Sequence, residues 1–463
     1  MKRIKRNIKT ATNLDAIKAM RRGNREAEQE LLGPGFHAHN WIQKSKKTYT
    51  RKMKHKIFFA LWMVLTLGAH AQGFLSVQTV GVLPTNTAEE NSRNLQAAID
   101  KMSALGGVLY VEPAEGGYPM QGGIVLKRNV TLLGAHGPTG RGTALPDRSG
   151  PTGSLFVITD RQQPFLTVES ATQVRGIQFY YPEQAWQDPN AIIAYPTTIR
   201  MAPGQYVQGV TLSCLTFYGE YMAMDFRAQA PNICEQILFE HCYGYPLSGQ
   251  FIAIDRCYDV PRILHCHINP ANMREFGRSF KREVIDSVVR QKTYSYWIDH
   301  TDNAQLMDLF TFGVYGGIYL GSETYGQMTN FNFDCVGVGI HKLGSQWTNR
   351  NWQIAQGSII ANVGERLEDV HPILIEGKGH TSLSNVESFS GGNPALTTLG
   401  ASWDYITVRG EASVTMTGCR MHGYKADTPI HVSPEAELHT FGCEECPLPP
   451  TPPEAKRGKW TTR

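Results

Sequence analysis

Residues 313–321 read GVYGGIYLG, and residues 335–344 read CVGVGIHKLG. Three pairs of identical residues in these stretches are 22 positions apart: Val314/Val336, Gly317/Gly339 and Ile318/Ile340. A short apolar strand that recurs in this way cannot bury a face alone, but it can when its copies stack. The repeat therefore predicts a solenoid of stacked coils.

Looser copies of the same strand recur along much of the chain. The earlier copies are GIQF from Gly176, GVTL from Gly209, QILF from Gln236 and RILH from Arg262, and later ones are expected around Leu309, Phe331, Ile354, Val386, Val414 and Leu438. These strands are rich in Val, Ile, Phe and Thr and are separated by turns of Gly, Asn and Pro. Their uneven spacing is typical of coils whose loops vary in length.

A helix is expected in front of the coils, from Thr85 to Ser103. Thr85, Asn86 or Thr87 can cap it, and the residues of its apolar face are Leu95, Ala98, Ile99 and Met102. Gly106 and Gly107 end the helix before the apolar strand at 108–111.

The same region carries a family resemblance. NLQAAID from Asn94, GGVLYVEP from Gly106 and NVTLLGAHG from Asn129 resemble the entry of the pectate-lyase-like superfamily, whose fold is a right-handed parallel β-helix. Within it, the chain looks most like the rhamnogalacturonase or glycoside-hydrolase-28-related type. The resemblance implies an all-β fold, one β-helix domain over residues 72–446 and an N-terminal capping helix. The superfamily includes polysaccharide lyases, glycoside hydrolases, epimerases and phage tailspikes, so the resemblance does not imply one reaction.

The N-terminal region predicts export. An apolar run at 57–67 follows three basic residues at 54–56, and Ala69-His70-Ala71 is a small-x-small cleavage pattern. Residues 53–71 are therefore predicted to be a signal peptide, and residues 1–52 an over-extended gene start. The mature protein is expected to be secreted or periplasmic and not bound to a membrane.

The charge balance changes when residues 1–71 are removed. They hold 16 of the 45 Lys and Arg residues and 4 of the 41 Asp and Glu residues, so 29 basic and 37 acidic residues remain, a net charge of −8. An acidic mature chain argues against a nucleic-acid partner.

The nine cysteines leave at least one unpaired, and Cys214, Cys242 and Cys266 have apolar neighbours typical of buried thiols.

Two segments interrupt or end the repeat. Residues 270–296 predict a short helical insertion, because Phe276, Phe280, Val284 and Val288 recur every fourth position. Its basic side chains are interpreted as a solvated helix face, with a cleft wall for acidic glycans as the functional alternative. The Pro-rich tail 447–463 is expected to be disordered.

Three aspartates follow aliphatic residues at similar places in three coils: Asp225, Asp255 and Asp299. Because side chains alternate along a strand, these carboxylates would point outward if Met224, Ile254 and Ile298 point inward. Stacked on neighbouring strands, they would form a column in which one pKa rises and another stays low. Such a split supplies the acid and the base of glycoside hydrolysis. Strand-ending or turn-binding aspartates are the structural alternative.

Polar and aromatic residues around this column are candidates for substrate binding. They are Tyr195, placed one coil before Asp225, Tyr181, Glu183 and Trp186 from one loop, and Arg256, Asp259, His300 and Asp302 beside the acids. Aromatic rings next to carboxylates are typical of sites for sugars, whose faces are apolar.

The sequence thus favours an exported glycoside hydrolase that cleaves a polysaccharide and needs no cofactor or metal. A polysaccharide lyase is the first alternative: Ca²⁺ held by the aspartates would neutralise a uronate, and Arg256, His300 or Lys292 would take the proton. A non-catalytic glycan-binding or structural β-helix is the second.

Overall fold

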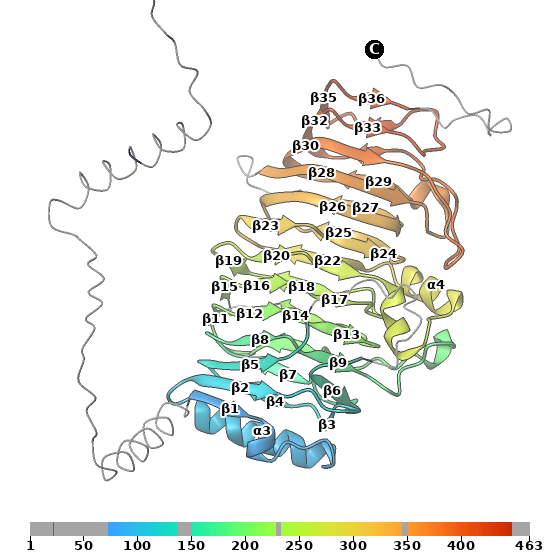
Figure 1. The fold of residues 1–463 in the computed structure, drawn as a ribbon. Helices are drawn as coiled ribbons and strands as arrows, with labels where there is room; N and C mark the ends of the chain where they lie inside the picture. The colour runs from blue at the N-terminus through green and yellow to red at the C-terminus, as the bar shows by residue number, and fades with distance from the viewer. Residues whose placement is uncertain (1–21, 23–72, 138–150, 228–232, 345–350, 447–463) are drawn as a thin grey trace, which may run out of the picture. The chain divides into compact units, whose positions relative to one another are not determined.

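The computed structural model describes residues 22, 73–137, 151–227, 233–344 and 351–446. The described residues between 73 and 446 belong to one compact unit. Within these residues every named strand pairing is parallel, and each strand lies next to its counterpart in the adjacent coil (Figure 1). The predicted all-β, right-handed parallel β-helix is confirmed.

One sheet of eleven described strands, called sheet B here, runs through the coils. Its strands are β4 (Ile124–Leu126), β7 (Leu166–Val168), β10 (Ile199–Met201), β14 (Met224–Arg227), β18 (Ile252–Asp255), β22 (Tyr294–Asp299), β25 (Gly316–Leu320), β27 (Val338–Lys342), β29 (His371–Ile375), β31 (Ile406–Val408) and β34 (Ile430–Val432).

A larger sheet, called sheet A, has two halves separated by a sharp corner. Its first half comprises β1 (Phe74–Ser76), β2 (Gly107–Val111), β5 (Val130–Gly134), β8 (Gln173–Arg175), β12 (Thr211–Ser213), β16 (Leu238–Glu240), β20 (Arg262–Leu264), β23 (Ala304–Met307), β32 (Glu411–Thr417) and β35 (Glu437–Phe441). Its second half comprises β3 (Tyr118–Met120), β6 (Leu155–Ile158), β9 (Gln178–Tyr180), β13 (Thr216–Tyr218), β17 (Tyr243–Gly244), β21 (His267–Ile268), β24 (Phe310–Phe312), β33 (Arg420–Met421) and β36 (Glu444–Glu445). Three long strands run through both halves: β26 (Gly326–Val336), β28 (Asn351–Ala361) and β30 (Lys378–Ser388).

From β8 onward, the corner of sheet A is made in each coil by one residue with positive φ. These residues include Cys214, His241, His265, Asp308, Asn330, Gln356 and Asn385, with φ between 51° and 56°. A single left-handed residue turns the chain without a loop, so the corner residues of successive coils also stack.

A third, short sheet of β11 (Val207–Gln208), β15 (Cys234–Glu235) and β19 (Cys257–Tyr258) lies between sheets B and A in the chain.

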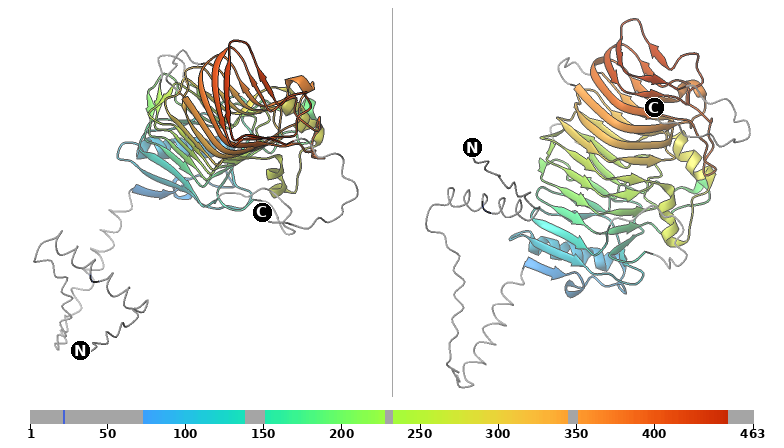
Figure 2. Two further views of the ribbon diagram at one scale, coloured as in Figure 1. Left: turned by 90° about the horizontal axis from the view of Figure 1, so that it is seen from above. Right: turned by 45° about the horizontal axis from the view of Figure 1, so that its top comes forward.

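The predicted capping helix is confirmed as α3 (Ala88–Met102), which covers the first coils (Figures 1 and 2). Thr87 caps it, because its side-chain oxygen accepts a hydrogen bond from the backbone N–H of Glu90. Leu95 and Ile99 are fully buried on the side of the helix that packs against the first coils. Without this helix the end coil would expose its apolar interior.

The predicted insertion is confirmed in part. It contains the 3₁₀ helix η4 (Pro270–Phe276) and α4 (Arg282–Arg290), but its last residues already belong to β22. The helix α4 buries Val284, Ile285, Val288 and Val289. Short 3₁₀ turns complete the described elements: η2 (Gln78–Val80), η3 (Pro189–Ala191) and η5 (Leu367–Asp369).

The core is a set of stacked apolar rows inside the coils. Ile252 and Tyr296 lie opposite each other, as do Ile254 and Ile298, and all four have at most 1% of their surface exposed. All nine cysteines are free thiols, and six of them are buried, including Cys242 and Cys266 as predicted. Cys214 is only half-buried, because it is a corner residue of sheet A. No helix among the described residues is long and apolar enough to cross a membrane.

The 22-residue repeat has the predicted register, since Ile318 lies opposite Ile340. The alignment of GIQF with GVTL was wrong: Thr211 of β12 lies opposite Gln173 of β8, whereas Gln178 of β9 lies opposite Thr216. Both strands occur in each coil, and their similar apolar patterns made them look equivalent. The predictions for residues 1–52, 53–71 and 447–463 lie outside the described residues.

Candidate active site

Asp255 and Asp299 end neighbouring strands of sheet B and lie directly opposite each other, as predicted. The residue after each of them, Arg256 and His300, has a positive φ of 56° and 39°. The chain therefore turns away at the same point in both coils, which leaves the two carboxylates at the same edge of the sheet. Their side chains are 22% and 21% exposed, so they are half-buried but reachable.

Asp225 does not complete the predicted column of three. Its partner on β18 is Ala253, and it is Arg227 that lies opposite Asp255. The strand β14 continues for two residues after Asp225, so this side chain lies two positions back along the strand. Arg227 binds both of its carboxylate oxygens, at 2.9 Å from Nε and 2.7 Å from Nη2. The column of carboxylates is therefore a pair, with an arginine in the third position.

His300 connects the two acids. Its Nδ1 lies 2.8 Å from Oδ1 of Asp255 and 3.5 Å from Oδ1 of Asp299. Its backbone N–H donates to the same oxygen of Asp299 at 3.0 Å. Arg256 approaches Asp255 from the other side, with Nε 3.8 Å from Oδ2. Two nitrogen-bearing side chains thus face Asp255.

The two acids differ in their electrostatic surroundings. Burial raises the pKa of Asp299, the positive charges of His300 and Arg256 and the backbone N–H of His300 oppose the rise, and the charge of Asp255 adds to it. A raised pKa favours the protonated form of a carboxyl group, which can donate its proton to a leaving group. Asp255 instead faces the nitrogen atoms of His300 and Arg256.

Gly321 keeps the space beside Asp299 open. A Cβ at this position would lie 2.2 Å from Oδ1 and 2.5 Å from Cγ of Asp299. The coil that follows the acid pair therefore has no side chain where the carboxylate lies.

The same cluster has the spacing of a cation site. One ligand atom each from Asp255, Asp299 and His300 lie within 4.8 Å of one another. Two carboxylates and an imidazole suit a transition metal better than Ca²⁺, which takes 6–8 oxygen ligands.

Sequence reasoning missed an aromatic row on the same face. Two residues before Asp299, Trp297 points outward and lies opposite Tyr319, which in turn lies opposite His341. The rings of Trp297 and Tyr319 stack with centroids 3.8 Å apart. Both are half-buried, so part of each ring reaches solvent beside the acid pair.

Polar contacts hold the upper end of this row in place. His341 lies between Tyr294 and Glu376, with its Nδ1 2.7 Å from the Tyr294 hydroxyl and its Nε2 2.7 Å from a Glu376 oxygen. The signal for the row was present in the 22-residue repeat, because Tyr319 and His341 follow directly after the matching residues Ile318 and Ile340.

The aromatic residues that the sequence did single out lie elsewhere. Tyr195 and Tyr181 are 2% and 1% exposed and pack on each other with centroids 4.6 Å apart, so neither can stack on a sugar. Arg200 lies opposite Asp225, in the place that had been predicted for Tyr195.

Glu183 and Trp186 are at the opposite edge of sheet B, because their loop leads into β10 whereas the acids end β18 and β22. Glu183 is exposed and pairs with Arg161 at 2.6 Å. Trp186 packs against Phe280 and lies under the guanidinium of Arg278. Neither residue joins the acid pair.

Asp259 and Asp302 lie in the turns that follow the acids. Asp259 accepts a hydrogen bond from the side chain of Gln236, and Asp302 accepts one from the hydroxyl of Tyr325. Both carboxylates thus hold the turns beside Arg256 and His300.

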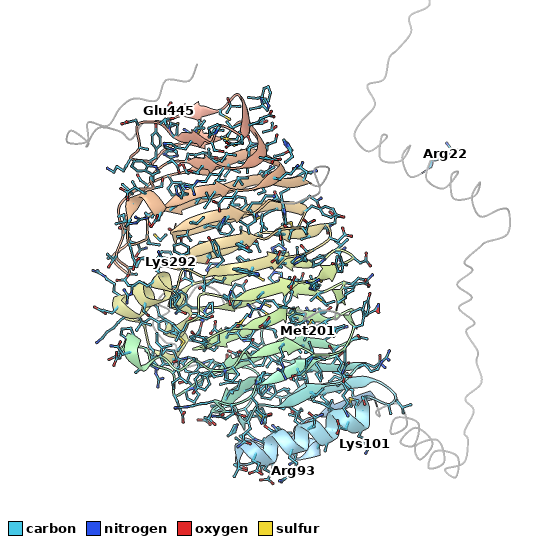
Figure 3. The ribbon with its side chains drawn as sticks, turned by 180° about the vertical axis from the view of Figure 1, so that it is seen from behind. Arg22, Arg93, Lys101, Met201, Lys292 and Glu445 are labelled. Atoms are coloured by element: carbon cyan, nitrogen blue, oxygen red, sulfur yellow. The ribbon has the colours of Figure 1, made fainter. Side chains whose placement is uncertain are left out.

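Lys292, the third candidate base, precedes β22 and lies 3.6 Å from Glu365, next to α4 (Figure 3). The length of β22 separates it from Asp299 by roughly 20 Å.

No protein-family model matches the chain, and no curated protein matches it in sequence. Solved structures with a similar course include the A-module of the mannuronan C-5 epimerase AlgE6 of Azotobacter vinelandii, with 12% identity over 81% of this chain and 100% of that one and a TM-score of 0.40. The catalytic unit of a GH87 α-1,3-glucanase of Streptomyces thermodiastaticus has 11% identity over 80% and 68%, with a TM-score of 0.44. The pre-mature gene product 12 of bacteriophage phi29 has 12% identity over 83% and 58%, with a TM-score of 0.40. At these values the function has to be argued from the site itself.

Proposed function

We propose that the protein is an exported carbohydrate-active enzyme that cleaves a polysaccharide by glycoside hydrolysis. Asp299 acts as the general acid, and Asp255 is the carboxylate that attacks the sugar or activates water. The observation that carries the proposal is the pairing of two carboxylates on adjacent strands, one with a raised pKa and the other beside His300 and Arg256. Glycoside hydrolysis uses two carboxyl groups, one as the general acid and the other as the base or nucleophile.

The aromatic row supports a sugar as the substrate. Trp297 lies on the same strand as Asp299 and on the same outer face. A sugar held on the exposed part of the Trp297–Tyr319 stack would have its apolar face against the rings and its glycosidic bond within reach of the acids. His300 positions Asp255 and Asp299 relative to each other through its ring and its backbone N–H.

The test is a screen of the purified protein against neutral and acidic polysaccharides, with reducing ends and the ultraviolet absorbance of unsaturated uronates read together. Asp255→Asn and Asp299→Asn are each expected to lower the rate by about 10²–10⁴-fold. Asp369→Asn is the matched control, because Asp369 lies in η5, before β29, pairs with Arg366 and does not belong to the acid pair. Hydrolysis by this pair is supported if the unmodified protein produces reducing ends without ultraviolet absorbance and both site variants do not produce them.

Full cleavage by both site variants would contradict the assignment of the acids. Binding without cleavage of any polysaccharide would favour the non-catalytic alternative.

The cation-compatible spacing of Asp255, Asp299 and His300 favours one other reaction, a metal-assisted polysaccharide lyase. In that case Asp255 and Asp299 would hold the cation and Arg256 would be the remaining base at the site. The imidazole fits Ca²⁺ poorly, so this function ranks second. Absorbance that appears with the products and disappears after chelation would establish it in place of hydrolysis.

The narrower assignments belong to the same proposal. A glycoside-hydrolase-28-related type is supported by the sequence resemblance of the entry segment and by the paired aspartates at the strand ends. Export to the periplasm or the medium is supported by the signal-peptide pattern at 53–71. Mass spectrometry of the exported protein should find Gln72 or a residue close to it as the N-terminus and no peptide from residues 1–52.

A further inference from the structure

A hollow of about 390 Å³ opens on the second half of sheet A, on a different sheet from the acid pair. Residues of five successive coils line it, from His267 to Glu387. The residues that matter for its chemistry are Phe310, Asn332, Gln356, Ser358, Asn385 and Glu387.

The hollow exists because large side chains give way to small ones along one row. From coil to coil this row reads Tyr243, His267, Phe310, Asn332, Ser358 and Glu387. The first three are rings, and the rings of His267 and Phe310 stack with centroids 4.2 Å apart and planes inclined by 12°. Phe310 ends the stack, so its far face borders the shorter Asn332 and Ser358. The hollow therefore has an aromatic floor.

Carboxamides form one wall. Asn330, Gln356 and Asn385 are the corner residues of three successive coils, with φ of 55°, 56° and 52°. All three are exposed. Because the coils are about 4.8 Å apart, the wall offers a hydrogen-bonding amide at each coil. Asn332 also lines the hollow, and its Oδ1 is buried and accepts no hydrogen bond from the described part of the chain.

The ionisable groups of the hollow already have partners. Oδ2 of Asp308 lies 2.8 Å from Nδ1 of His265. Glu387 is within 3.0 Å of His422 and 3.5 Å of Arg420. What remains for a ligand is a ring face and neutral amides, and the two carboxylates disfavour an anion.

We propose that this hollow binds one sugar residue of a neutral glycan, as a second and non-catalytic site. The apolar face of the sugar would lie on Phe310, and its hydroxyls would bond to Asn332, Gln356 and Asn385. The volume is within the range of small-ligand sites. The proposal stands on the chemistry of the hollow, whichever reaction the acid pair performs.

The experiment probes an array of neutral and uronate-containing oligosaccharides with the Asp255→Asn protein, so that the glycans are not consumed. The neutral hexasaccharide with the strongest signal is then titrated by calorimetry. Ser358→Phe, added to this background, fills the hollow and is expected to lower the affinity by about tenfold, a loss of about 1.4 kcal/mol. Gln353→Phe is the matched control, because Gln353 is exposed on the same strand but lies outside the hollow.

Gln356→Ala, an exposed truncation that leaves the strand intact, is the second variant and should also weaken binding. The proposal is overturned if no neutral oligosaccharide binds, if uronates bind better, or if Ser358→Phe binds as tightly as its control. The hydrolase assignment is judged separately, by the cleavage rates of Asp255→Asn and Asp299→Asn, which do not enter this titration.

Discussion

At the scale of single residues, the acid pair depends on what surrounds each carboxylate more than on the aspartates themselves. Arg256 and His300 have a backbone conformation that non-glycine residues adopt rarely and at some cost in free energy. In return, the chain turns sharply enough for the ring of His300 to reach back to Asp255 on the preceding coil. Asp225 precedes no such turn, and it forms an ordinary ion pair with Arg227.

Gly321→Ala tests the geometry of Asp299 without touching a charge. The new methyl group would lie 2.2 Å from the present position of Oδ1, so the carboxylate has to rotate away. Because misplacing a reacting group by about 1 Å can cost on the order of 10²-fold, we expect a loss of activity of that size with little change in Tm. The measurement is the initial rate on the polysaccharide found in the screen.

Gly391→Ala is the matched control, since a Cβ there would meet no atom within 4 Å. Equal activity of the two variants would show that the position of Asp299 does not matter for cleavage.

At the scale of elements, the parallel pairing of sheet B turns sequence repeats into functional rows. Trp297, Tyr319 and His341 come from three strands, β22, β25 and β27, yet they form one continuous surface because the register is kept. The long strands of sheet A produce the row of Phe310, Asn332 and Ser358 in the same way. Each row is a surface that runs along the solenoid.

Trp297→Ala is expected to weaken substrate binding more than it slows chemistry. The variant removes a ring beside the acids but leaves Asp255 and Asp299 in place, so KM should rise by about tenfold while kcat changes little. Initial rates at increasing polysaccharide concentration separate the two parameters. Phe441→Ala removes an exposed ring from β35 and serves as the control. A fall in kcat with unchanged KM would contradict a role of Trp297 in binding.

At the scale of the whole molecule, stability comes from coil stacking, so a buried charge in one coil weakens the solenoid there. Glu220 follows β13 and is completely buried. Its carboxyl lies close to Gly244, where a Cβ would be 2.4 Å from Oε1. Burial raises the pKa of Glu220 to about 8, although backbone N–H groups of Glu220 and Tyr245 oppose the rise.

This raised pKa predicts how the free energy of unfolding depends on pH. The unfolded chain ionises Glu220 near pH 4.5, whereas the folded protein keeps the proton up to about pH 8. Unfolding therefore releases a proton between these values, and stability should fall by about 1.4 kcal/mol per pH unit as the pH rises.

Urea titrations between pH 5 and pH 8 measure this slope, which should be lost in Glu220→Gln. Glu437→Gln, at an exposed position of β35, should leave the slope unchanged. The same slope in wild type and Glu220→Gln would assign it to other groups.

The solenoid, its capping helix and the pairing of Asp255 with Asp299 could be predicted from the sequence, because each rests on a short-range pattern repeated one coil later. The third aspartate was placed wrongly for a related reason. Because side chains alternate along a strand, the sequence shows on which face of the sheet Asp225 lies. It does not show which residue of the next strand lies opposite, and the structure places Asp225 opposite Ala253, two residues before Asp255.

What the sequence determined by itself is the architecture, since apolar strands of this spacing and a capped helix can bury their faces in few other ways. Only the tertiary structure decided which side chains meet. The ring of His300 reaches the preceding coil, Gly321 leaves room for a carboxylate, and Tyr195 is buried instead of exposed. These contacts depend on the lengths of the loops and on where each strand ends. Both are set by the packing of whole coils against one another, which no single stretch of sequence encodes.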